Sequence, residues 1–151
     1  MKDKPRYSLV KKFYLLLLLA LVFSGFGQMP IFKRYYIADI PGLAWSSNFH
    51  TNFIVHYISS ILLLGLFGYV IVDYFLLGRK RISLTKAAYL RIVLIGCLTI
   101  TGILGVINNL GGVTFSQGFT MFVDLSHMGL TMIFLITALV LLILRKKWSN
   151  G

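Results

Sequence analysis

Acidic residues and cysteines are scarce in this chain of 151 residues, which has four aspartates, no glutamate and one cysteine. Paired carboxylates for acid–base catalysis are therefore absent from its apolar segments. The single Cys97 lies inside an apolar run, which excludes a disulfide framework, a thiolate metal cluster and covalent attachment of a c-type haem. The sequence also lacks a phosphate-binding glycine loop and a nucleophile elbow. These absences argue against a soluble enzyme.

Apolar residues are abundant instead. They make up 58% of the chain, and the mean hydropathy is +0.84, whereas ordinary globular domains are about 45–50% apolar. A helix needs roughly 20 apolar residues to cross a bilayer, and four runs approach or exceed that length, at about 13–27, 49–77, 88–107 and 119–144. The sequence therefore predicts an all-α membrane protein, a bundle of four transmembrane helices forming one membrane domain over 1–151.

The first of these runs has features of a signal peptide. Two lysines, Lys11 and Lys12, precede it, and small residues beginning with Ser24 lie where a cleavage site would be. Because the chain starts at Met1, we interpret the run as an uncleaved first span.

Basic residues predict the orientation. Thirteen of the 15 lie before the first span, between the second and third spans or, for Arg91, at the start of the third, and after the fourth; only Lys33 and Arg34 lie in the opposite loops. Because positive residues mark the cytoplasmic side, both termini are expected in the cytoplasm, as in a multi-pass protein of the cell inner membrane. Anionic lipids are sufficient partners for this charge, and no nucleic acid is needed to explain it.

Two histidines lie well inside the spans, away from the interface, where ionisable residues are costly and therefore candidates for function. His56 is about seven residues into the second span and His127 about eight into the fourth, both counted from the outer end, so their depths match. Imidazoles on two helices of a bundle are able to clamp one metal ion, and the iron of haem b suits them. The pattern predicts that His56 and His127 are axial ligands of one haem b in the outer leaflet, with no catalytic residue in this chain.

The surroundings of these histidines suit a flat macrocycle. Ser59 and Ser60 are small residues next to His56, and Lys33 and Arg34 lie near the outer surface, where haem propionates would meet positive charge. The alternative is that each histidine only bonds a neighbouring helix, a contact of about 0.5–2 kcal/mol.

His50 and Asp124 are two further ionisable residues, and the sequence is compatible with more than one role for each. His50 lies at the interface and points to another face than His56; it is a candidate for a quinone site, an alternative ligand or an ordinary surface residue. Asp124 lies one turn outward from His127, where it would orient the imidazole, accept a proton, or pair with Lys33 or Arg34. The alternative is an interfacial residue near the start of a helix, where the helix dipole stabilises a carboxylate.

Two other features are interpreted as structural. Cys97, Thr101 and Gly105 repeat at four-residue spacing, which is typical of a helix-packing surface. Arg91 is expected to extend toward the cytoplasmic headgroups.

Matched histidines on helices two and four, with the N-terminus inside, resemble the gamma-type cytochrome b subunits of formate dehydrogenases, nickel–iron hydrogenases and thiosulfate reductases. The resemblance covers spans two to four and implies that His56 and His127 ligate the haem nearer the outer face. It also implies a periplasmic iron–sulfur or cytochrome partner and exchange of electrons with quinone.

The chain departs from that family at its second haem. The first span has no histidine, and the position fourteen residues after His127 is Leu141, so the haem on the cytoplasmic side is expected to be absent. The resulting hypothesis is a single-haem electron-transfer subunit of a respiratory oxidoreductase complex, relaying electrons between quinone and a periplasmic partner. The alternative is a cofactor-free membrane anchor or assembly subunit. A transporter is disfavoured, because the inner halves of the spans are almost purely apolar.

Overall fold

The computed structural model describes residues 4–29, 33, 35–78, 83–146 and 149–150. The chain divides into two compact units, Met1–Gly78 and Arg79–Gly151, and each unit is a helical hairpin described here by itself. The four spans that the sequence groups in one membrane domain are thus organised as two successive hairpins.

The first hairpin consists of α1 (Lys4–Gln28) and α3 (Phe49–Asp73), which pack side by side. The segment between them contains two short 3₁₀ helices, η1 (Ile37–Asp39) and η2 (Ala44–Ser47). At its far end α3 continues directly into the π-helical turn η3 (Tyr74–Gly78).

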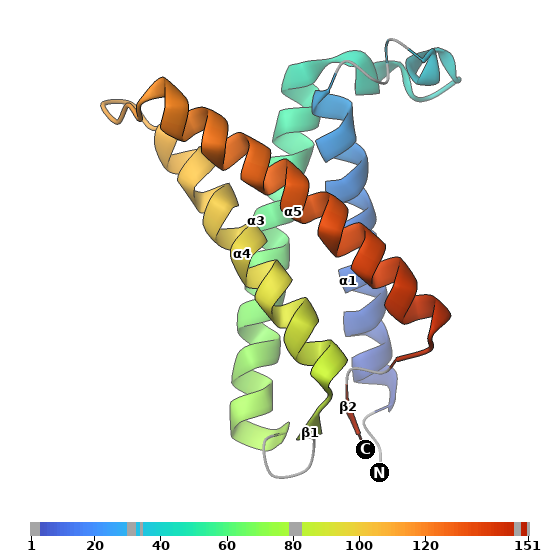
Figure 1. The fold of residues 1–151 in the computed structure, drawn as a ribbon. Coiled ribbons are helices and arrows are strands. Elements are labelled where there is room, and N and C mark those ends of the chain that lie inside the picture. Colours follow the sequence, from blue (N-terminus) through green and yellow to red (C-terminus); the bar gives the residue numbers. More distant parts are fainter. Residues whose placement is uncertain (1–3, 30–32, 34, 79–82, 147–148, 151) are drawn as a thin grey trace. The chain divides into compact units, whose positions relative to one another are not determined.

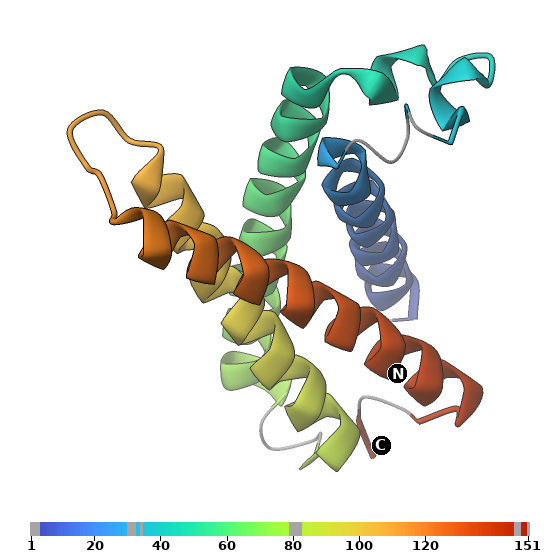
Figure 2. The ribbon, with the colours of Figure 1, turned by 45° about the horizontal axis from the view of Figure 1, so that its top comes forward.

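The second hairpin consists of α4 (Lys86–Asn108) and α5 (Gln117–Ile143), joined by a short loop. Two-residue strands, β1 (Ser83–Leu84) and β2 (Ser149–Asn150), pair antiparallel beyond the open end of this hairpin. Figures 1 and 2 both show α4 and α5 lying close together near the loop and diverging toward β1 and β2.

Local sequence signals set the helix starts. The three later helices each begin after a side chain that accepts a hydrogen bond from the backbone N–H three residues on, at Asn48, Thr85 and Ser116. Such caps satisfy one of the free N–H groups of a first turn. In the loop before α5, Gly112 has φ +88°, a conformation that glycine adopts without steric cost.

All four helices are long and apolar enough to cross a membrane, over Ser8–Gly27, Phe49–Leu76, Lys86–Asn108 and Gln117–Ile143. Only 6–11% of the residues in their most apolar stretches are buried, so the rest of this apolar surface needs a lipid environment. The predicted all-α class and multi-pass membrane character are therefore confirmed. The first helix begins at Lys4 rather than near residue 13, because helical structure extends beyond the apolar stretch that hydropathy detects.

Small polar residues are prominent among the buried positions of the first hairpin. Ser24 and Asn52 are fully buried, and Ser59 is 7% exposed. The buried apolar residues of the second hairpin are Ala88, Leu94, Val123 and Phe134. Segments that approach closely through small side chains are typical of helix pairs in membranes, where packing rather than hydrophobic exclusion drives association.

Candidate functional site

His56 lies in α3 with its imidazole against α1 of the same hairpin. Its Nδ1 is 3.2 Å from the Ser24 hydroxyl and 3.2 Å from the Leu21 carbonyl oxygen. A Cβ atom built on Gly25 would be 3.4 Å from the imidazole Cε1, in van der Waals contact with the ring. Gly25 therefore lies directly beside the imidazole.

His127 occupies a similar position in the second hairpin, with its imidazole against α4. Its Nδ1 is 2.8 Å from the Thr101 hydroxyl, and the ring also hydrogen-bonds the backbone of Leu98. A Cβ atom on Gly102 would be 3.6 Å from the imidazole Cε1. As in the first hairpin, a hydroxyl contacts Nδ1 and the next residue is a glycine beside Cε1.

The two arrangements share a fourth member. The hydroxyl four residues after each histidine donates to the carbonyl of that histidine: Ser60 to His56 and Thr131 to His127, both at 2.8 Å. We call Ser24, Gly25, His56 and Ser60 the first histidine cluster. The second histidine cluster is the matching set Thr101, Gly102, His127 and Thr131. The hydroxyl and the imidazole that it contacts are 32 residues apart in the first cluster and 26 in the second.

The contacts of the ring indicate which nitrogen carries the proton. A carbonyl oxygen only accepts hydrogen bonds, so the Leu21 carbonyl beside His56 Nδ1 favours a proton on that nitrogen. The other ring nitrogen, Nε2, then carries a lone pair, and this is the form in which imidazole binds a metal. Within the described residues, no three His, Cys, Asp or Glu side chains come together as a metal site.

Asn52, one turn before His56, links the segments at the connected end of the first hairpin by hydrogen bonds. The fully buried Asn52 donates through Nδ2 to the carbonyls of Ser46 at 2.6 Å, Asn48 at 2.9 Å and Gly27 at 3.2 Å. It therefore holds the end of α1, the turn η2 and the start of α3 together, which supports the position of the first histidine cluster.

The small and basic residues predicted around His56 have different positions. Ser59 is buried, whereas Ser60 bonds the His56 carbonyl rather than facing the ring. Lys33 is exposed, and Arg34 lies outside the described residues. None of these positions tests the predicted contact with haem propionates, which stays a prediction.

His50 and Asp124 are both exposed. His50 is in the first turn of α3, and Asp124 is in α5, where Thr101 rather than Asp124 contacts the Nδ1 of His127. Their proposed roles in proton transfer or quinone binding stay predictions.

Ser24 and Thr101 are partners of the histidines that were not predicted. Ser24 was expected near a cleavage site and Thr101 on a packing surface, yet each hydroxyl contacts an imidazole. The available signal was a repeated pattern: a hydroxyl residue followed by glycine on one helix, and a histidine followed four residues later by a hydroxyl residue on the next.

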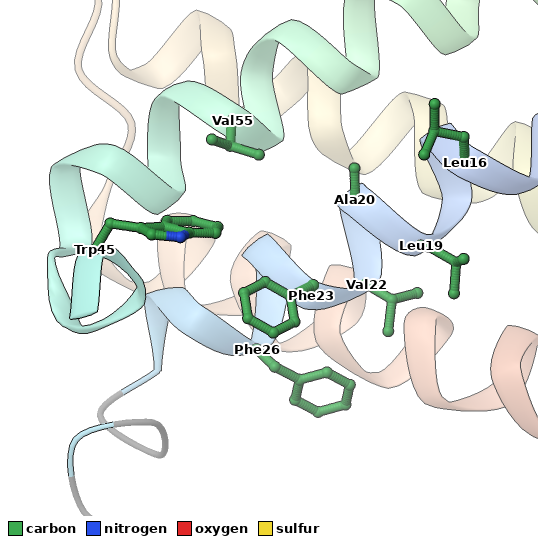
Figure 3. Close-up of a pocket in the computed structure, with 8 residues that line it drawn as sticks. All are labelled: Leu16, Leu19, Ala20, Val22, Phe23, Phe26, Trp45 and Val55. Carbon is green, nitrogen blue, oxygen red and sulfur yellow. The ribbon is translucent and has the colours of Figure 1, made fainter. Parts of the chain in front are cut away.

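An apolar groove of about 550 Å³ lies on the first hairpin beside η2. Figure 3 shows the Trp45 ring between Val55 of α3 and Phe23 of α1, and the centroids of the Trp45 and Phe23 rings are 5.6 Å apart. The other lining residues are Leu16, Leu19, Ala20, Val22 and Phe26. The groove suits a hydrocarbon chain and offers almost no group for chemistry.

A second cavity, of about 710 Å³, lies where α4 and α5 diverge. It combines basic side chains, Lys86, Arg145 and Lys146, with leucines of both helices. Arg91 nearby is only 9% exposed, and its Nη2 donates to the Lys146 carbonyl at 3.2 Å. The Arg91 guanidinium therefore reaches the backbone after α5, at the end of the same hairpin, and its predicted extension to the headgroups stays a prediction.

No protein-family model, curated protein or solved structure matches this chain. The resemblance to gamma-type cytochrome b subunits therefore stays a prediction drawn from topology and two histidines.

Proposed function

We propose that this protein is a haem b-containing electron-transfer subunit of a respiratory oxidoreductase complex in the cell inner membrane. The observation that carries the proposal is the shared construction of the two histidine clusters. In each, Nδ1 hydrogen-bonds groups of the same hairpin. In the Nδ1–H tautomer, Nε2 carries the lone pair with which an imidazole binds a metal.

One haem b accounts for two such clusters. His56 of the first hairpin and His127 of the second would be the residues that hold it. The bound group would supply one-electron transfer. An intramembrane histidine is costly, and a pair with the same local surroundings is better explained by one shared ligand than by two separate packing needs.

The wider function follows from the resemblance. Electrons would pass between quinone and a periplasmic iron–sulfur or cytochrome subunit, with both termini of this chain in the cytoplasm. His50 and Asp124 are the candidates for a quinone site near the outer surface. The cavity with Lys86, Arg145 and Lys146 suits the headgroups of anionic lipids at the cytoplasmic surface.

One observation favours the competing function, a cofactor-free anchor or assembly subunit. Each imidazole already hydrogen-bonds the partner helix of its own hairpin, as a purely structural histidine does in a membrane. The two functions differ in whether the protein carries haem.

The test is a dithionite-reduced minus air-oxidised absorbance spectrum of the full chain, purified in detergent with its native complex. We expect a b-type band of about one haem per chain, lost in both His56→Ala and His127→Ala. His50→Ala is the matched control and is expected to retain the band. A complex without any b-type band attributable to this chain would exclude the haem function and leave the anchor.

A further inference from the structure

The hydroxyls of Ser24 and Thr101 each donate a hydrogen bond to a carbonyl of their own helix. Ser24 Oγ donates to the Ala20 carbonyl at 2.6 Å, and Thr101 Oγ1 donates to the Cys97 carbonyl at 3.0 Å. A hydroxyl has one proton and two lone pairs. Toward the imidazole, each hydroxyl is therefore left as an acceptor.

Backbone groups reinforce this polarity in both hairpins. The residue three positions before each hydroxyl also bonds the ring: the Leu21 carbonyl for His56 and the Leu98 backbone for His127. The Leu98 carbonyl additionally accepts from Thr101 Oγ1 at 3.1 Å. Acceptors thus lie at Nδ1 of His56, and the same kind of backbone group lies beside the His127 ring. This arrangement favours the Nδ1–H tautomer over a proton on Nε2.

We propose that Ser24 and Thr101 are positioning residues that hold His56 and His127 as Nδ1–H tautomers and make Nε2 a stronger electron donor to a bound iron. The tautomer assignment stands on the hydrogen bonds alone, whereas the effect on the iron rests on the proposed haem function. A hydrogen bond from the far nitrogen of a ligating histidine raises its basicity, which favours ferric over ferrous iron and lowers the midpoint potential.

The two hydroxyls are expected to contribute unequally. Thr101 is 2.8 Å from His127 Nδ1, whereas Ser24 is 3.2 Å from His56 Nδ1 and shares that nitrogen with the Leu21 carbonyl at the same distance. Hydrogen bonds weaken with length, so removing the Thr101 hydroxyl has the larger effect.

The first experiment reads the tautomer directly. The full chain is labelled with ¹⁵N-histidine and studied by NMR in detergent, with His56→Ala and His127→Ala to assign the signals. We expect the ring proton of both histidines on Nδ1. A proton on Nε2 of either histidine would overturn the assignment for that cluster. The spectrum is recorded on protein without bound haem, because iron at Nε2 would by itself leave the ring proton on Nδ1.

The second experiment is a potentiometric titration of the b-type band in Thr101→Val, which keeps the shape of threonine without the hydroxyl. Outer-shell changes of this kind alter metal-site properties about tenfold or more. We therefore expect the ferric-to-ferrous ratio at a fixed potential to fall about tenfold. For one electron, this is a rise of the midpoint potential by about 59 mV. Thr101→Ser restores the wild-type value, and Ser24→Ala shifts the potential less.

Thr131→Val is the matched control, because its hydroxyl bonds the His127 carbonyl and not the ring. An unchanged potential in Thr101→Val, in a protein that carries the b-type band, would overturn the tuning role and leave the haem function intact. Absence of the band in the wild type would instead contradict the haem function and leave the NMR result as the test of the tautomer.

Discussion

The two hairpins differ in how their helices are connected and agree in how they hold a histidine. A long segment with two 3₁₀ helices joins α1 to α3, whereas a short loop joins α4 to α5. The asparagine at the connected end also differs. Asn52 lies in the first turns of α3 and bonds three carbonyls, whereas Asn108 ends α4, accepts from the Phe115 N–H at 3.0 Å and donates to Thr120 at 3.3 Å.

The two hairpins differ in their connecting segments and agree in the groups around their histidines. Connections between helices tolerate variation, because they lie outside the packed segments. The histidine clusters lie inside the helices and have the same donors and acceptors in both hairpins, although their sequence separations differ by six residues. The shared feature is therefore the chemistry around the imidazole, which is the basis for treating the two histidines as equivalent.

The largest expected effect on stability would come from breaking the asparagine contact of one hairpin. Asn52→Leu removes a fully buried side-chain donor from the carbonyls of Gly27, Ser46 and Asn48. The Asn48 carbonyl keeps its bond from the backbone N–H of residue 52, and each buried group left unsatisfied costs about 1–3 kcal/mol. Asn108→Leu affects a half-buried residue with two bonds and is expected to cost less.

Hydrogen exchange of the full chain in detergent measures both changes locally. We expect lost protection at the start of α3 in Asn52→Leu and a weaker loss at the loop before α5 in Asn108→Leu. Equal losses in the two variants would contradict the difference between the two hairpin ends.

The next effect concerns the glycines beside the imidazoles. Gly25→Val places a branched side chain where Cβ alone would already contact His56 Cε1 at 3.4 Å, so we expect the methyl groups to displace the ring. Gly102→Val acts in the same direction but less strongly, because the corresponding distance is 3.6 Å. The measurement is the position of the histidine ring signals by NMR, together with the intensity of the b-type band.

Gly105→Val is the control for these substitutions, because no atom lies within 4 Å of a Cβ built there. If Gly105→Val displaced a histidine signal as much as Gly25→Val does, the effect would not come from contact between the new side chain and the ring. That result would contradict the role of Gly25 beside the imidazole.

The smallest effect is expected at the hydroxyls after each histidine. Ser60 and Thr131 bond only the carbonyl one turn earlier in their own helices, a contact that adds little to helix stability. Ser60→Ala and Thr131→Val should each change the free energy of unfolding by no more than about 0.5 kcal/mol, measured by thermal unfolding in detergent. A larger loss in one hairpin alone would show that the two clusters are not equivalent.

The sequence by itself determined the four spans and the two intramembrane histidines. Whether a helix is apolar enough to lie in lipid depends on its local run of residues. Hydropathy therefore located the apolar parts of all four long helices. The predicted depth of His56 and His127 follows from the same count along each helix.

Only the tertiary structure decided which groups contact those histidines. Ser24 and Thr101 are small polar residues, 32 and 26 residues away from their partners, and hydropathy gives them no signal within an apolar helix. Arg91 illustrates the same limit, because a carbonyl 55 residues away binds it. Such contacts depend on the rotation of one helix against its neighbour, which is set by side-chain packing across the hairpin rather than by the local sequence.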